Sequence, residues 1–152
     1  MFVYYAFPVD AVNLGLNRDH HWRVYVQSVP LALLQKIMND PIFYIPQRAF
    51  VAGRTPHPAL QEVNEEALAR ADLVVAFLPW GVVSYGVPIE VSQARMMGKK
   101  VLLFIGDEEH RNPSWVFPHG DHDNGNTRVR TFTFAEVEAV LQHEGTKTWL
   151  NG

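Results

Sequence analysis

Short apolar runs alternate along the chain with longer stretches in which apolar residues recur at helical spacing. Residues 73–78 (LVVAFL) and 100–105 (KVLLFI) are nearly unbroken apolar runs, which is typical of parallel strands covered on both faces. Between them, residues 87–97 have the length of a helix and are followed by Gly98, a residue that favours helix ends. This order predicts strand–helix–strand units.

The rest of the chain continues the same alternation. The expected strands are residues 2–7, 42–45, 73–78, 100–105 and 130–134. The expected helices are residues 18–39, with a kink or break at Pro30, then 57–71, 87–97 and 134–144. Residues 47–58 and 106–128 are expected as loops because they are rich in polar residues, glycine and proline. The sequence predicts one α/β domain over 1–152, with a doubly wound, mostly parallel sheet.

Composition narrows the classes of function. The 152 residues are 47% hydrophobic, which is typical of a packed globular chain, and the net charge of -3 offers no basic field for a nucleic-acid polymer. The absence of cysteine excludes disulfides, thiolate catalysis and cysteine-bound metals. The sequence shows neither a signal peptide nor an apolar run of membrane-spanning length, so we expect a cytoplasmic protein without a membrane partner.

Candidate chemistry follows from the expected sheet, since ligands of such sheets bind outside the carboxyl ends of the strands. The loop 79–86 leads into the helix 87–97, which places Glu90 in the first helical turn. The helix dipole there favours an ionised carboxylate, which can act as a nucleophile. A glutamate at that position also commonly serves helix stability alone. Ser84 and Gly86 favour the functional interpretation because small residues allow close approach of a ligand.

A wider motif surrounds these residues. It consists of residues 71–76 (ADLVVA), then Ser84-x-Gly86-x-x-x-Glu90, then Ala94 and residues 98–101 (GKKV). Over about residues 64–105 the chain resembles the nucleoside 2-deoxyribosyltransferase family. It also resembles the nucleotide-hydrolysing relatives of that family, the 2'-deoxynucleoside 5'-monophosphate N-glycosidases and the CMP hydrolases.

The resemblance implies a five-stranded, flavodoxin-like three-layer sandwich that forms a homodimer or a larger homo-oligomer. It implies a small nucleoside or nucleotide as substrate, with no metal and no cofactor. Glu90 matches the family nucleophile, which attacks the anomeric carbon in a retaining double displacement. Whether water or a second base accepts the glycosyl group stays open.

Three positions depart from the family pattern. Ser84 matches the nucleotide hydrolases, in which a serine contacts the 5'-phosphate, whereas the transferases carry aspartate there. Asn64 stands where the family has an acid, so it can orient a substrate but cannot protonate the leaving base, a step left to Glu65, Glu66 or water. The first loop lacks the hydrolases' phosphate-binding pattern. The arginines that could replace it are Arg18, Arg23, Arg48 and Arg54, and we name Arg48 as substrate-binding.

Aromatic residues leave the first strand at the expected cleft. We assign Tyr5 and Phe7 to stacking on a nucleobase, and Tyr4 is a further candidate, although alternation requires at least one of the three in the core. The histidines at 20–21 and 119–122 lack the spacing of a known metal site. The alternative function is a nucleotide-binding protein that has lost the chemistry. A third possibility is a scaffold in which Glu90 only stabilises its helix.

Overall fold

A computed structural model describes residues 1–8, 24–49, 57–78, 84–106, 122–132 and 134–152. Its sheet has the strand order β2-β1-β3-β4-β6-β5, in which β5 alone is antiparallel to its neighbour. The strands are β1 (Phe2–Ala6), β2 (Ile42–Tyr44), β3 (Leu73–Leu78), β4 (Lys100–Gly106), β5 (His122–Asn124) and β6 (Thr127–Phe132). The helices are α2 (Val29–Ile37), α3 (Pro46–Ala49), α4 (His57–Arg70), α5 (Gly86–Met96), α6 (Phe134–Gln142) and α7 (Glu144–Asn151).

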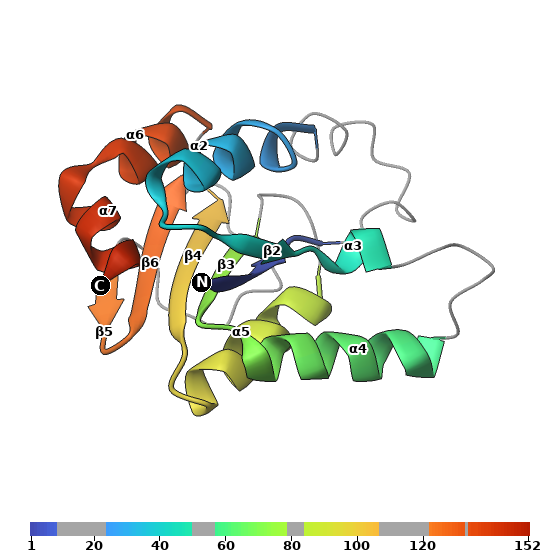
Figure 1. The fold of residues 1–152 in the computed structure, drawn as a ribbon. Helices are drawn as coiled ribbons and strands as arrows, with labels where there is room; N and C mark the ends of the chain where they lie inside the picture. The colour runs from blue at the N-terminus through green and yellow to red at the C-terminus, as the bar shows by residue number, and fades with distance from the viewer. Residues whose placement is uncertain (9–23, 50–56, 79–83, 107–121, 133) are drawn as a thin grey trace.

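Helices cover both faces of the sheet (Figure 1), with α2, α6 and α7 on one side and α4 and α5 on the other. Each face has its own apolar core. Leu34 of α2, Leu141 of α6 and Leu150 of α7 belong to the first core, while Leu68 of α4 and Val91 of α5 belong to the second. The predicted flavodoxin-like three-layer arrangement is therefore confirmed.

The central strands are apolar because both of their faces are covered. All six residues of β3 are buried, and Phe77 stacks on Phe104 of β4 with ring centroids 5.1 Å apart. Strand order reverses between β1 and β3, because the chain passes from β1 to β2 on one side of β1 and then to β3 on its other side. Ligands of doubly wound sheets bind near such a reversal.

The five expected parallel strands are present, and the structure adds a sixth. Residues 122–124, expected within a loop, form the edge strand β5, and β6 starts at Thr127 rather than at 130. The two strands are joined by Gly125 and Asn126, with Gly125 at φ +57°. A glycine in the first position of a two-residue loop is a known hairpin signal, so the sequence contained this turn.

The helices confirm one expectation and differ from expectation at three places. Helical residues 24–26 are separated from α2, and Pro30 lies in the first turn of α2, so the helix is split as expected; residues 18–23 lie outside the described ranges. The short helix α3 lies in an expected loop, and α7 was not expected. Helix α5 starts at Gly86, one residue early. Within the described residues, no helix is both long and apolar enough to cross a membrane.

Candidate functional site

A pocket of about 340 Å³ lies between α4, α5 and β1 and contains Glu90. Its lining residues recur at helical spacing because one face of each helix is turned towards the gap. They are Leu60, Gln61, Asn64, Glu65 and Leu68 of α4, Gly86, Ile89, Glu90 and Gln93 of α5, and Tyr4 of β1. The volume falls within the range of small-molecule sites, about 300 to 1,000 Å³.

Glu90 is half-buried and is the fifth residue of α5. The expectation that it lies in the first turn is wrong, since the helix starts at Gly86 and its first turn holds no acidic residue. The earlier start accompanies a contact from Ser84, whose Oγ accepts a hydrogen bond from the Val87 amide at 3.3 Å. The helix dipole acts mainly on the first turn, so the neighbours of Glu90 matter more than the dipole.

One neighbour of Glu90 in the pocket is Tyr4, which is fully buried in the middle of β1. Its hydroxyl makes no regular hydrogen bond with the described residues, yet it lies within electrostatic reach of the Glu90 carboxylate. Burial first, and then the charge of Glu90, raise the pKa of Tyr4 well above its usual value. Tyr4 is therefore a neutral hydroxyl held beside the carboxylate.

Asn64 enters the same pocket from α4 and is half-buried. Its Oδ1 lies 2.6 Å from the hydroxyl of Tyr44, at the end of β2. The Tyr44 ring packs against Tyr4 with centroids 5.4 Å apart, and burial, followed by Glu90, raises the pKa of Tyr44. Tyr4 and Asn64 thus share the pocket with the carboxylate, and Tyr44 lies behind them, in contact with both.

Ser84 and Gly86, both expected to contact substrate, have different placements. Gly86 is exposed and lines the pocket, and a Cβ added there would meet no described atom within 4 Å. Ser84 is 1% exposed, accepts the hydrogen bond from the Val87 amide near the start of α5 and does not line this pocket. A direct phosphate contact by Ser84 stays a prediction.

Tyr5 and Phe7 are not brought to the pocket. Both are buried in the core on the α2 side of the sheet, and the Tyr5 hydroxyl donates to the Val26 carbonyl oxygen. Successive side chains of a strand point to opposite faces, so Tyr4, between Val3 and Tyr5, points to the α4 and α5 side. Arg48 is exposed on α3 and does not line the pocket. The stacking residues and the cation assigned from the sequence therefore lie elsewhere.

Two residues of the site, Tyr4 and Tyr44, were missed or left unassigned by the sequence analysis. Alternation along residues 2–7 showed that neighbouring side chains point to opposite faces of the sheet. It did not show which of these side chains lies on the face of Glu90. Arg18, Arg23 and Arg54 lie outside the described residues, as do His20, His21 and His119. Among the residues that are described, no three His, Cys, Asp or Glu side chains gather as metal ligands would.

Two larger hollows, of about 500 and 520 Å³, lie where β4 begins, and Lys99 lines both. They are more polar than the Glu90 pocket, and two of their charged groups make hydrogen bonds that hold the fold. Lys99 Nζ donates to the Ala69 carbonyl oxygen at 2.7 Å, and Asp72 Oδ2 accepts from the Phe2 amide at 2.7 Å. We therefore place the candidate site at Glu90 despite its smaller volume.

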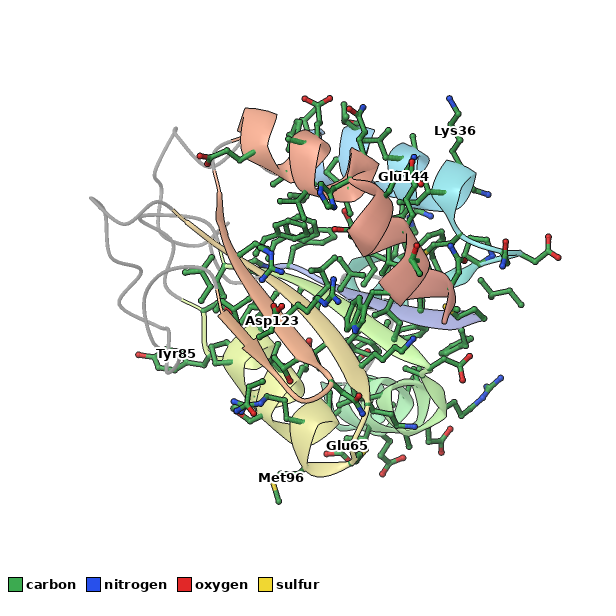
Figure 2. All side chains as sticks on the ribbon, turned by 90° about the vertical axis from the view of Figure 1, so that its left-hand side faces the viewer. Lys36, Glu65, Tyr85, Met96, Asp123 and Glu144 are labelled. Atoms are coloured by element: carbon green, nitrogen blue, oxygen red, sulfur yellow. The ribbon has the colours of Figure 1, made fainter. Side chains whose placement is uncertain are left out.

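Of three exposed side chains on α4 and around α5, only Glu65 lines the pocket. Glu65 lies on the solvent side of α4, whereas Tyr85 and Met96, at the two ends of α5, project away from the fold (Figure 2). Tyr85 and Met96 are 74% and 88% exposed, and neither lines the Glu90 pocket. Glu65 does line it and accepts a hydrogen bond from Gln61 at 3.2 Å.

No family model and no curated protein matches this sequence. Among solved structures, the fold is similar to that of a conserved protein from Enterococcus faecalis V583, with a TM-score of 0.55 and 19% identity over 74% of this chain and 68% of that one. It is also similar to a 2-deoxyribosyltransferase from Bacillus psychrosaccharolyticus, with a TM-score of 0.52 and 14% identity over 69% of this chain and 72% of that one. This chain therefore shares the three-layer α/β fold of a 2-deoxyribosyltransferase.

Proposed function

We propose that this protein cleaves or exchanges the N-glycosidic bond of a nucleoside, a deoxynucleoside or one of their 5'-monophosphates, with Glu90 as the nucleophile. The observation that carries the proposal is a half-buried carboxylate in a pocket of about 340 Å³, next to a buried tyrosine hydroxyl. The fold shared with a 2-deoxyribosyltransferase supports the same chemistry.

The reaction uses Glu90 twice. In the first step a carboxylate oxygen forms a bond to the anomeric carbon while the carbon–nitrogen bond breaks, and the electron pair stays on the base. In the second step water or another base attacks the same carbon, and the carboxylate leaves. The carboxylate charge also stabilises the oxocarbenium-like transition state.

The remaining lining suits a nucleoside. Leu60, Leu68 and Ile89 supply apolar surface for the flat face of a base or for the sugar, while Asn64 and Gln93 supply amides. Glu65 lines the same pocket and is the candidate acid for protonating the leaving base, whereas Glu66 does not line it. We expect no metal, and we expect a homodimer or larger assembly.

The decisive experiment compares the purified wild-type protein with two variants, Glu90→Gln and Glu65→Gln. Each is incubated with ribo- and deoxynucleosides and their 5'-monophosphates, with and without a second free base, and the products are separated by chromatography. Loss of the nucleophile should lower base release by about a thousandfold or more, because no covalent intermediate forms. Equal turnover by wild type and Glu90→Gln would contradict the proposal.

The same experiment assigns the leaving-group acid and the acceptor. If Glu65 protonates the base, Glu65→Gln loses activity mainly on substrates with poor leaving groups, while Glu90→Gln loses it on all. If Glu65 has no such role, Glu65→Gln keeps wild-type rates. Transfer to the added base identifies a transferase, and release without transfer identifies a hydrolase.

A second candidate is a nucleotide-binding protein without the chemistry. It is favoured by Asn64, an amide that cannot donate a proton as a carboxylic acid does. Such a protein would be stabilised thermally by nucleotides and would release no base. Base release by the wild type excludes this candidate.

A further inference from the structure

The hydrogen bond between Tyr44 and Asn64 has a direction. The two oxygens are 2.6 Å apart, a distance normal for O–H···O and short for N–H···O, which centres at about 2.9 to 3.0 Å. Tyr44 is therefore the donor and the Asn64 carbonyl oxygen is the acceptor. The ring of Tyr44 is in turn held by its contact with the buried ring of Tyr4.

This bond decides what Asn64 offers to a ligand. A side-chain amide has one acceptor oxygen and one NH2 group with two donors, on opposite sides of a planar group. Since the bond turns Oδ1 towards Tyr44, the group on the other side of the amide, which we infer is offered to the pocket, is Nδ2. An unrestrained asparagine could turn either its oxygen or its nitrogen to a ligand, but here a turn would break the bond to Tyr44.

We propose that Tyr44 is a positioning residue that holds Asn64 as a hydrogen-bond donor, so that the site selects bases presenting an acceptor at that point. A pyrimidine carbonyl oxygen and an unprotonated purine ring nitrogen are both such hydrogen-bond acceptors. The proposal rests on the proposed function, because it describes the substrate of the Glu90 site. It concerns recognition, and the chemistry of Glu90 is separate from it.

The donor also bears on bond cleavage. When the carbon–nitrogen bond breaks, the electron pair moves onto the base, and an N–H donor at a base acceptor stabilises the negative charge that develops there. The proton that the departing base needs comes from Glu65, the candidate acid, or from water. An asparagine in this orientation can thus assist departure without giving up a proton.

Binding measurements test this selection without requiring turnover. We would measure the affinity of Glu90→Gln for pairs of free bases that differ in one acceptor: adenine against 3-deazaadenine, and uracil against 2-thiouracil. The same pairs are measured with Tyr44→Phe, Asn64→Leu and Asn64→Asp added to that background. Tyr25→Phe is the matched control, since it removes a hydroxyl in the opposite helix layer.

At least one pair should bind about tenfold more tightly in its acceptor-bearing form, the size of one hydrogen bond. The preference should survive Tyr25→Phe, disappear in Asn64→Leu and shrink in Tyr44→Phe, in which the amide is free to turn. Asn64→Asp should reverse it, because a carboxylate only accepts. Melting temperatures verify that each variant is folded.

The outcomes separate this inference from the proposed function. Discrimination in Glu90→Gln without any turnover by the wild type would remove the proposed function and leave the inference standing. Turnover by the wild type without discrimination between the paired bases would overturn the inference alone. Unchanged discrimination in Tyr44→Phe would overturn the positioning role of Tyr44, and failure of every base to bind would overturn the whole inference.

Discussion

At the scale of single residues, the two adjacent tyrosines of β1 have opposite tasks. Tyr4 points to the α4 and α5 side, where its hydroxyl lies near Glu90 without a regular hydrogen bond from the described residues. Tyr5 points to the other side, where its hydroxyl donates to Val26. One hydroxyl is thus available to the candidate site and the other is committed to the fold.

Replacing each tyrosine by phenylalanine should separate these tasks. Tyr4→Phe should change the free energy of unfolding by less than about 1 kcal/mol, because no regular hydrogen bond is lost. It should lower base release about tenfold, because a donor beside Glu90 disappears. Chemical denaturation and the chromatographic assay provide the two measurements.

Tyr5→Phe is the paired control. It should destabilise the protein by about 1 to 3 kcal/mol, since the buried Val26 carbonyl oxygen loses its donor, and it should keep the wild-type rate of base release. If Tyr5→Phe slowed the reaction while Tyr4→Phe did not, the assignment of Tyr5 to substrate made from the sequence would be right and the one made from the structure would be wrong.

At the scale of elements, the last helix is fastened to the sheet and to α2. Asn151 Nδ2 donates to the carbonyl oxygens of Ile37 and Lys147, both at 2.9 Å, and its Oδ1 accepts from the Asn39 amide at 2.9 Å. The Trp149 ring is contacted by the cations of Lys100 and Arg128. These contacts hold α7 over the first core, on the face opposite the candidate site.

Asn151→Ala should therefore destabilise the protein by about 1 to 3 kcal/mol, because the partly buried Ile37 carbonyl oxygen at the end of α2 loses this donor. Thermal or chemical unfolding measures the change. The control is Lys147→Ala, which removes a solvent-exposed ion pair with Glu144 and should cost no more than about 1 kcal/mol. Equal losses in the two variants would contradict the role given to Asn151.

At the scale of the whole molecule, burial of tyrosines in both cores links stability to alkaline pH. Burial is the main cause that raises the pKa of Tyr4 and Tyr5 well above the usual value of 10 and that of Tyr25 to about 12. Nearby acids add to this effect, Glu90 for Tyr4 and Glu138 for Tyr25. In the folded chain these three hydroxyls thus stay protonated at pH values at which the same hydroxyls ionise in the unfolded chain.

Stability should accordingly be constant up to about pH 10 and fall above it, since the unfolded chain then binds fewer protons than the folded chain. Each tyrosine that stays protonated when folded adds a slope of about 1.4 kcal/mol per pH unit. Denaturation curves between pH 8 and pH 12 would measure it. Tyr5→Phe should reduce the slope, and a slope unchanged by that variant would refute this account.

The features that the sequence predicted well are those whose signal lies within a few neighbouring residues. The strand β3 was predicted with its observed bounds because six consecutive apolar residues have few alternatives to a strand buried on both faces. The pairing of Asn64 with Glu90 in one pocket could be expected from the motif, since both lie on helices that flank β3. The hairpin of β5 and β6 carried a local signal at Gly125 that was overlooked.

The sequence by itself determined the order of the elements, the doubly wound sheet and the carboxylate worth testing, because these depend on local periodicity and on a contiguous motif. Only the tertiary structure decided that Tyr4 rather than Tyr5 reaches Glu90, that Tyr44 holds the Asn64 amide, and that α7 is tied to α2. The physical reason is that alternation along a strand places neighbouring side chains on opposite faces of the sheet. It does not say which helices cover each face. Contacts between residues far apart in the chain exist only once the layers have packed.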